Sequence, residues 1–144
     1  MGYPPHLVAP MAAELEDAGF TSLKSVEEVD NVLREGEGTT LLMVNSVCGC
    51  AAGAARPGVI HSLTHSVKPD KTVTVFAGVD MDATQRARQY LLPYPPSSPA
   101  VALFKDGQLV HMIERHHIEG RSAAMIAANL MAAYEEFCKT VPSN

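Results

Sequence analysis

Two cysteines separated by a single glycine, Cys48-Gly49-Cys50, are the residues of this sequence best suited to do chemistry. A cysteine thiolate is the nucleophile of disulfide exchange and also a ligand for soft metal ions. A disulfide between these two residues would close a small ring with little freedom to reach the preferred dihedral angle of about 90°. We therefore expect a strained and easily reduced disulfide, suited to resolving mixed disulfides, with Gly49 relieving the backbone.

The residues on either side of the motif predict where the two thiols lie. Thr39–Asn45 is a near-continuous apolar run typical of a buried strand, and the alanine-rich stretch from Cys50 favours a helix. The free N–H groups and partial positive charge at a helix N-terminus stabilise a thiolate. We expect Cys48 to have a lowered pKa and to attack first, and Cys50 to be the more shielded, resolving thiol. Chance packing of two small residues is the alternative.

A proline at the start of a predicted strand is the second candidate site feature. Ser97-Ser98-Pro99 directly precedes the apolar run 100–104. An X-Pro bond at a strand entrance is a candidate for the rare cis isomer. An ordinary trans turn proline is the alternative, which the isomer base rate favours. The predicted order of elements would place Pro99 beside the cysteine pair, so we expect a cis bond between Ser98 and Pro99.

The remaining elements follow from hydrophobic periodicity and turn signals. Before the central strand we expect a helix over 6–17, an edge strand within 20–24 and a helix from Ser25. After it we expect a helix from Cys50 to about Val67 kinked at Pro57, a strand over 71–78 and a helix over 82–92. A hairpin of strands 100–104 and 108–113 and a helix over 122–137 complete the chain. The strand–helix–strand unit predicts parallel strands with a right-handed crossover. This order is similar to that of the thioredoxin core. We expect an α/β, thioredoxin-like three-layer αβα sandwich with a mixed sheet, formed by residues 1–144 as one domain.

Composition and charge narrow the class of partner. The chain has 11 Lys and Arg residues and a net charge of -5, which disfavours nucleic acid, and it has no apolar run long enough to span a membrane. Residues 1–6 lack the basic start and apolar stretch of a secretory signal, which predicts a cytoplasmic location. The expected partners are therefore proteins or small molecules.

Four other features are weaker candidates. His61 and His65 could share a helical face and bind a metal, but a solvated pair is favoured over a ligand pair. We expect a surface turn at His116-His117 and a bystander role for Cys138 rather than a third redox role. Arg56 either attracts an anionic thiol substrate or forms a surface salt bridge.

With these motifs in view, the chain resembles the bacilliredoxins, thioredoxin-like bacterial proteins with a Cys-Gly-Cys centre. The resemblance covers nearly the whole chain. It rests on the stretches Glu37-Gly38-Thr39-Thr40, Val44 to Gly53, Thr72 to Gly78, Ser97-Ser98-Pro99 and Arg115 to Gly120.

The resemblance implies removal of bacillithiol from S-bacillithiolated cytosolic proteins, with disulfide exchange or isomerase activity also expected. It implies that Cys48 takes the bacillithiol as a mixed disulfide and that Cys50 then displaces it. Neither a prosthetic group nor a metal is expected. Two alternatives remain open from the residues alone: a soft-metal-binding Cys-x-Cys module and a non-enzymatic redox sensor.

Overall fold

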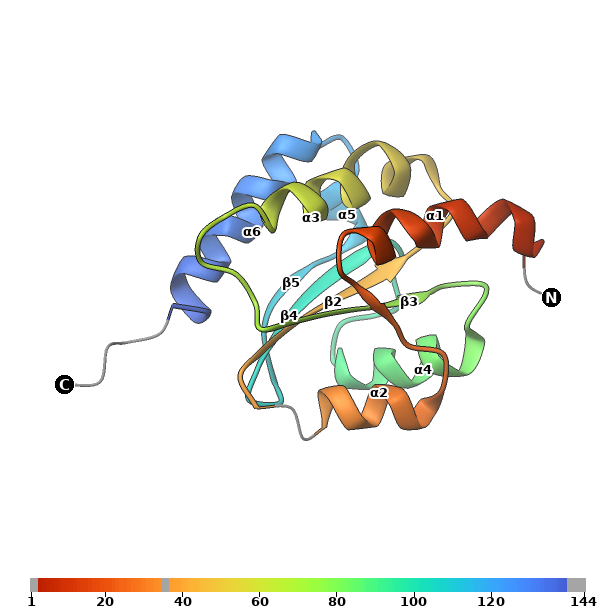
Figure 1. The fold of residues 1–144 in the computed structure, drawn as a ribbon, viewed down its shortest axis with the longest axis horizontal. Coiled ribbons are helices and arrows are strands. Elements are labelled where there is room, and N and C mark those ends of the chain that lie inside the picture. Colours follow the sequence, from red (N-terminus) through yellow and green to blue (C-terminus); the bar gives the residue numbers. More distant parts are fainter. Residues whose placement is uncertain (1–2, 35–36, 140–144) are drawn as a thin grey trace.

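The computed structural model describes residues 3–34 and 37–139 (Figure 1). Its elements are α1 (Pro5–Asp17), β1 (Thr21–Ser22), α2 (Val26–Leu33), β2 (Thr39–Asn45), a π-helix η1 (Ala51–Ala55), α3 (Arg56–Ser62), β3 (Lys71–Phe76), α4 (Met81–Tyr90), β4 (Ala100–Lys105), β5 (Gln108–Ile113), α5 (Arg115–Ile118) and α6 (Ala123–Phe137). The order of the predicted strands and long helices is confirmed.

The five strands form one mixed sheet in the order β1-β3-β2-β4-β5. β1 and β2 both run parallel to β3, whereas β4 is antiparallel to β2 and to β5. The central strand β2 is buried along its whole length, because it has a neighbour on each edge and helices on both faces. Val44 pairs with Ala100, so the end of β2 lies beside the start of β4.

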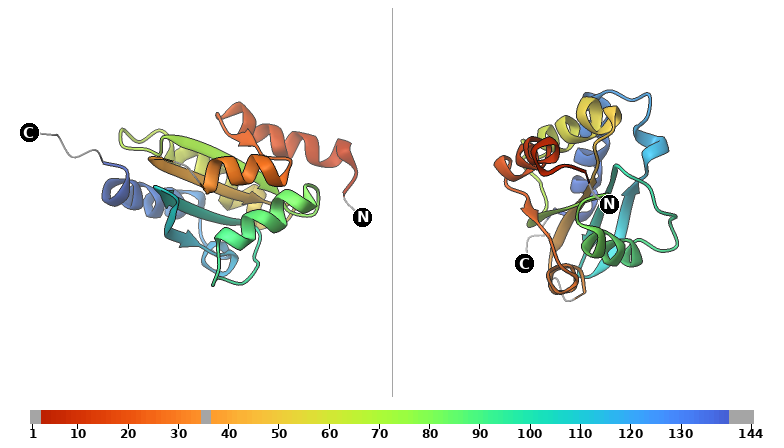
Figure 2. Two further views of the ribbon diagram at one scale, coloured as in Figure 1. Left: turned by 90° about the horizontal axis from the view of Figure 1, so that it is seen from below. Right: turned by 90° about the vertical axis from the view of Figure 1, so that its right-hand side faces the viewer.

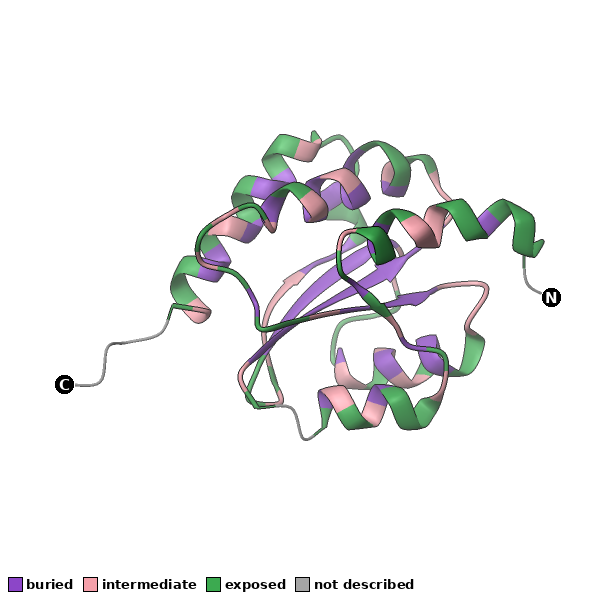
Figure 3. Cartoon of the chain, viewed as in Figure 1, coloured by how far each residue is buried: buried purple, intermediate pink, exposed green. Residues whose placement is uncertain are grey.

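Helices cover both faces of the sheet, and alternation along β2 separates two cores. Leu41 and Met43 pack with residues of α1, α3 and α6, whereas Leu42 and Val44 pack with residues of α2 and α4. Figure 2 shows the two helical layers on either side of the sheet, and Figure 3 shows that buried residues line the surfaces between the layers. The α/β fold class and the αβα sandwich expected from the sequence are therefore confirmed.

The helix after the cysteines differs from the prediction in length and in form. It ends at Ser62 rather than near Val67, and its first part is the π-helix η1. The N–H of Arg56 donates to the carbonyl of Ala51, five residues back. Pro57 has no N–H to continue the regular α-helical bonding, so the irregularity expected at this proline takes the form of a π turn just before it.

No helix among the described residues combines the length and the apolar character needed to cross a membrane.

Candidate functional site

The cysteine pair lies where β2 turns into the following helix, as its position in the sequence predicts. The carbonyl of Cys48 accepts hydrogen bonds from the N–H groups of Ala51 and Ala52, so the first helical turn begins at Cys48. Both cysteines are free thiols, and their Sγ atoms lie 2.8 Å apart. Gly49 has no positive φ, and a Cβ there would meet no atom within 4 Å. The free-thiol state therefore gives no steric reason for glycine at this position.

Hydrogen bonds converge on the sulfur of Cys48. The hydroxyl of Ser46 lies 3.2 Å from this sulfur, and the backbone N–H of Cys48 donates to the same hydroxyl oxygen at 3.3 Å. Burial raises the pKa of the Cys48 thiol, but hydrogen bonds from Cys50, Ser46 and the backbone N–H groups of Ala51 and Cys50 outweigh this effect. The pKa of Cys48 therefore lies below its ordinary value, in the direction expected at the start of a helix.

Cys50 is shifted in the opposite direction. Burial raises the pKa of the Cys50 thiol, and both its hydrogen bond to Cys48 and the negative charge of Cys48 raise it further. The charge of Arg115 lowers this pKa and only partly compensates. Both cysteines are partly buried, and Cys50 packs against the hydrophobic core. Burial raises the pKa of both thiols, so hydrogen bonding rather than burial accounts for the opposite directions of their pKa shifts.

The Ser98–Pro99 bond is cis, as expected, and Pro99 is buried at the start of β4. The start of β4 pairs with the end of β2, so the loop of residues 97–99 lies at the same end of the central strand as the cysteines. Arg115 holds the loop: its backbone N–H donates to Ser97 Oγ and its guanidinium to the carbonyl of Ser98, both at 3.1 Å. Arg115 is not recognisable as a site residue from the sequence, because this contact joins residues 17 positions apart across two strands.

Arg56 lies in the interior and not on the surface. Its side chain is 1% exposed, and its Nε donates to Glu14 Oε2 at 3.0 Å. Its Nη1 donates to Asn45 Oδ1 at 3.0 Å and to the carbonyl of Ser46 at 2.9 Å. The salt bridge considered for Arg56 is therefore formed, with the half-exposed Glu14, but the guanidinium is buried rather than at the surface. A buried guanidinium does not recruit a substrate from solvent.

His61, His65 and Cys138, the weaker candidates from the sequence, do not lie at the cysteine pair. His61 is exposed on α3, whereas His65 lies beyond the end of that helix and contacts Glu135 Oε1 at 3.0 Å. The helical His pair considered from the sequence is therefore not formed. Cys138 contacts Thr39 at the start of β2, which is the opposite end of the strand from Cys48.

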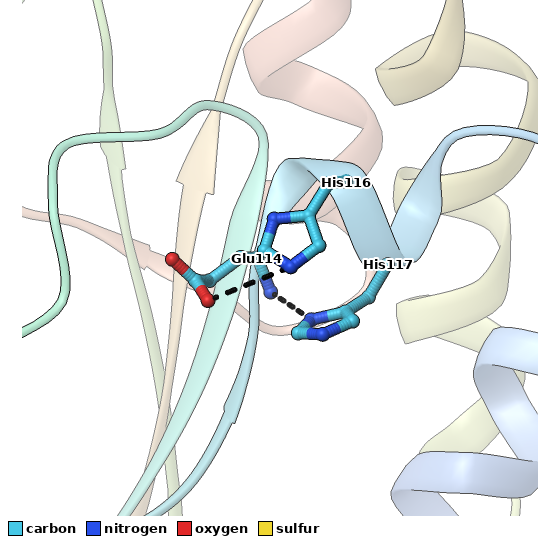
Figure 4. Close-up of side chains that lie close together, drawn as sticks. All are labelled: Glu114, His116 and His117. Atoms are coloured by element: carbon cyan, nitrogen blue, oxygen red, sulfur yellow. Dashed lines mark hydrogen bonds and ion pairs between the residues drawn. The ribbon is translucent and has the colours of Figure 1, made fainter.

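His116 and His117 are exposed, as expected, but they belong to the short helix α5 rather than to a turn. Figure 4 shows their rings close to the carboxylate of Glu114. The backbone N–H of Glu114 donates to His117 Nδ1 at 3.1 Å, and the Glu114 carboxylate accepts the backbone N–H of His117. His116 Nε2 lies 3.8 Å from Glu114 Oε2. Of the described residues, only these three gather closely enough for a three-ligand metal site, and the reciprocal cap of α5 already accounts for the position of two of them.

Known proteins are similar to this chain over most of its length. Residues 3–138 match a family model described as "Disulphide isomerase". A bacilliredoxin of Cytophaga hutchinsonii is 61% identical over 134 residues, which are 93% of this chain and 98% of that protein. A bacilliredoxin of Halalkalibacterium halodurans is 50% identical over 137 residues, 95% of each chain.

Solved thioredoxin structures share the fold at low sequence identity. Thioredoxin O2 of Arabidopsis thaliana superposes with a TM-score of 0.56 at 18% identity, covering 85% of this chain and 97% of its own. A mutant thioredoxin of Halobacterium salinarum gives a TM-score of 0.59 at 18% identity, covering 87% of this chain and 96% of its own. The fold is therefore thioredoxin-like. Because the family model spans most of the chain and the curated relatives are half or more identical to it, the chain belongs to the bacilliredoxin family.

Proposed function

We propose that this protein is a thiol–disulfide oxidoreductase that reduces mixed disulfides on cytosolic proteins, and that bacillithiol is the thiol it removes. Family membership and the thioredoxin-like fold support the general class. The observation that carries the proposal is the cysteine pair itself: two sulfurs 2.8 Å apart whose pKa values are shifted in opposite directions. The printed name of the relatives, bacilliredoxin, supports bacillithiol as the thiol.

In the first step, the Cys48 thiolate attacks the bacillithiol sulfur of a mixed disulfide. A new S–S bond forms between Cys48 and bacillithiol, the old S–S bond breaks, and the substrate protein leaves as a thiolate that takes a proton from water. Cys48 suits this role because its lowered pKa makes more of the reactive thiolate available near neutral pH.

In the second step, the Cys50 thiolate attacks the sulfur of Cys48. The Cys48–Cys50 disulfide forms and bacillithiol leaves as a thiolate, so the cysteine pair has supplied the two electrons that reduced the substrate. The negative charge of Cys48 raises the pKa of Cys50 before the reaction, and the mixed disulfide removes that charge. Cys50 therefore becomes easier to deprotonate when it is needed. A thiol reductant must then return the pair to the dithiol.

Gly49, Ser98 and Pro99 are proposed to support substrate binding. Gly49 is exposed between the two cysteines, so no side chain blocks the approach to the sulfurs. Ser98 and Pro99 lie at the start of β4, beside the end of β2. A substrate segment bound at Cys48 would therefore pass next to this loop.

Two other functions use the same cysteines. A soft-metal module would bind an ion such as Cu(I) through both thiols, although no group of three close metal-ligating residues in the described parts of the chain includes either cysteine. Metal content after purification under reducing conditions tests this alternative. A redox sensor would form the disulfide without turnover.

Disulfide isomerase activity is compatible with the first step and would need no attack by Cys50.

The test uses the variants Cys50→Ser and Cys48→Ser with one peptide carrying either bacillithiol or glutathione. We expect Cys50→Ser to accumulate a mixed disulfide on Cys48, detected by mass spectrometry, and Cys48→Ser to form no adduct at a comparable rate. The wild type should turn over the bacillithiol peptide faster than the glutathione peptide when a thiol reductant is supplied. Equal rates with the two peptides would contradict the preference for bacillithiol but not the general oxidoreductase activity. An adduct on Cys50 in Cys48→Ser at the wild-type rate would reverse the proposed order of attack.

A further inference from the structure

The buried guanidinium of Arg56 lies behind the turn that carries the cysteines, and no step of the exchange reaction uses it directly. A buried charge is costly unless it is paired and hydrogen-bonded. Arg56 meets this requirement with acceptors from α1 and from the end of β2: the Glu14 carboxylate at 3.0 Å, Asn45 Oδ1 at 3.0 Å and the Ser46 carbonyl at 2.9 Å. The planar fork of arginine fixes the directions of these bonds, which a single lysine ammonium cannot reproduce.

These bonds hold the residue that contacts the sulfur of Cys48. Asn45 Oδ1 accepts from the backbone N–H of Ser46 at 2.9 Å as well as from Arg56. Arg56 also binds the Ser46 carbonyl, so Ser46 is held at both its N–H and its C=O. The hydroxyl of the same serine lies 3.2 Å from Cys48 Sγ. Hydrogen bonds from Arg56 to the Asn45 side chain and the Ser46 backbone, and from the Ser46 hydroxyl to the sulfur, therefore connect Arg56 to Cys48 through Ser46.

We propose that Arg56 is a positioning residue for attack by Cys48, because it holds the Asn45–Ser46 turn in the conformation that keeps the Ser46 hydroxyl on the Cys48 sulfur. This inference rests on the proposed function, in which Cys48 is the attacking thiol. It assigns Arg56 no contact with substrate. A solely structural role would stabilise the fold without any coupling to Ser46.

A double-mutant cycle separates these two roles, because residues that act through one path have non-additive effects. The variants are Arg56→Lys, Ser46→Ala and the combination, and the readout is the pKa of Cys48 measured from the ultraviolet absorbance of its thiolate in a Cys50→Ser background. We expect each single variant to raise the pKa, because each weakens the hydrogen bond from Ser46. Arg56→Lys should add no further rise when Ser46 is already alanine.

The reaction rate gives a second readout. A rise of about one unit in pKa lowers the thiolate fraction about tenfold at a pH well below the pKa. Because a thiolate of higher pKa is intrinsically more nucleophilic, the rate should fall by only about threefold. Raising the pH should return the rate of Arg56→Lys to at least that of the wild type, an effect that loss of folded protein would not produce.

Two further variants distinguish a positioning effect of Arg56 from a general loss of stability. Glu14 is half exposed, so Glu14→Ala loosens the guanidinium with less risk to the core, and its effect on the Cys48 pKa should also vanish when Ser46 is alanine. Arg86 is the matched control, because it pairs with Asp30 at 2.8 Å between α2 and α4 on the other face of the sheet. Arg86→Lys should lower the melting temperature without shifting the Cys48 pKa.

The outcomes distinguish this inference from the proposed function. If neither Arg56→Lys nor Glu14→Ala is coupled to Ser46, while Cys50→Ser still traps substrate on Cys48, the positioning role is wrong and the proposed function stands. If no substrate is trapped on Cys48, the proposed function itself fails. Coupling of either variant to Ser46 together with trapping on Cys48 supports both.

Discussion

At the scale of single residues, two neighbouring, partly buried thiols differ in pKa because they differ in hydrogen bonding. Cys48 receives hydrogen bonds from the Ser46 hydroxyl and the Cys50 thiol, as well as from backbone N–H groups of the first helical turn. The shared hydrogen bond with Cys48 and the charge of that residue instead raise the pKa of Cys50. A donor next to a thiolate stabilises the charged form, so the direction of each shift follows from which sulfur accepts.

The contribution of Cys50 as a donor can be measured by replacing it with serine or alanine. The serine hydroxyl can still donate to the Cys48 thiolate, whereas alanine cannot. We therefore expect the pKa of Cys48 to be higher in Cys50→Ala than in Cys50→Ser. Rates of alkylation by iodoacetamide as a function of pH check this, since the rate should reach its plateau at a lower pH in the serine variant. Superimposable pH profiles would show that the Cys50 hydrogen bond is unimportant.

At the scale of elements, a close approach of two helices holds the cysteine-bearing segment against the core. Gly58 lies inside α3, where alanine would be the better helix former. A Cβ at this position would lie 2.9 Å from the carbonyl oxygen of Ala123 and 2.9 Å from Ile126 Cβ, both on α6. Helix α6 therefore packs against α3 at a distance that only glycine allows. The buried hydroxyls of Ser62 and Tyr134 join the same two helices at 2.8 Å.

Alanine substitutions in this helical segment should have opposite effects at two glycines. Gly58→Ala should lower the free energy of unfolding by about 1–3 kcal/mol, because the added methyl overpacks the helix contact. Gly53 is exposed and has no atom within 4 Å of an added Cβ, so Gly53→Ala should raise the free energy of unfolding by up to about 1 kcal/mol. Urea denaturation of both variants provides the measurement. An unchanged free energy of unfolding in Gly58→Ala would mean that α6 can move to make room for the methyl group without destabilising the fold.

At the scale of the whole molecule, Cys138 and Cys50 pack against the same core, and the length of the central strand β2 separates the third cysteine from the reactive pair. Cys138 contacts Thr39 at one end of β2, and Cys48 follows Asn45 at the other end. Six residue steps of about 3.3 Å along a strand place these ends about 20 Å apart. Burial also raises the pKa of the Cys138 thiol, which disfavours its reactive thiolate form. The fold therefore favours the bystander role of Cys138.

Replacing Cys138 with serine tests this separation. We expect Cys138→Ser to turn over a mixed-disulfide substrate at the wild-type rate and to keep the same Cys48 pKa. Mass spectrometry of the oxidised wild type should find the disulfide between Cys48 and Cys50, with Cys138 free. A Cys138 adduct formed during turnover, or a large loss of rate in the variant, would require an exchange path that this fold does not provide.

The sequence alone determined the features that depend on neighbours in the chain. The apolar run Thr39–Asn45 predicted the central strand, and the residues around the cysteines predicted a strand-to-helix turn. These two features follow from local preferences of the backbone and from the pattern of apolar side chains. The cis bond at Ser98–Pro99 was predicted from the expected order of the elements, because local preference favours the trans isomer. The four-residue helix α5 was missed because it is too short to show periodicity.

Only the tertiary structure decided what surrounds the cysteines. Arg56 lies close to them in the sequence, yet its burial depends on Glu14 in α1, 42 positions away. Arg115 reaches the carbonyl of Ser98 because β4 and β5 are paired. Cys138 is kept from the site because α6 ends near the opposite end of β2. These contacts join segments far apart in the chain, and their geometry is set by how the helices and strands pack, which local sequence preference does not specify.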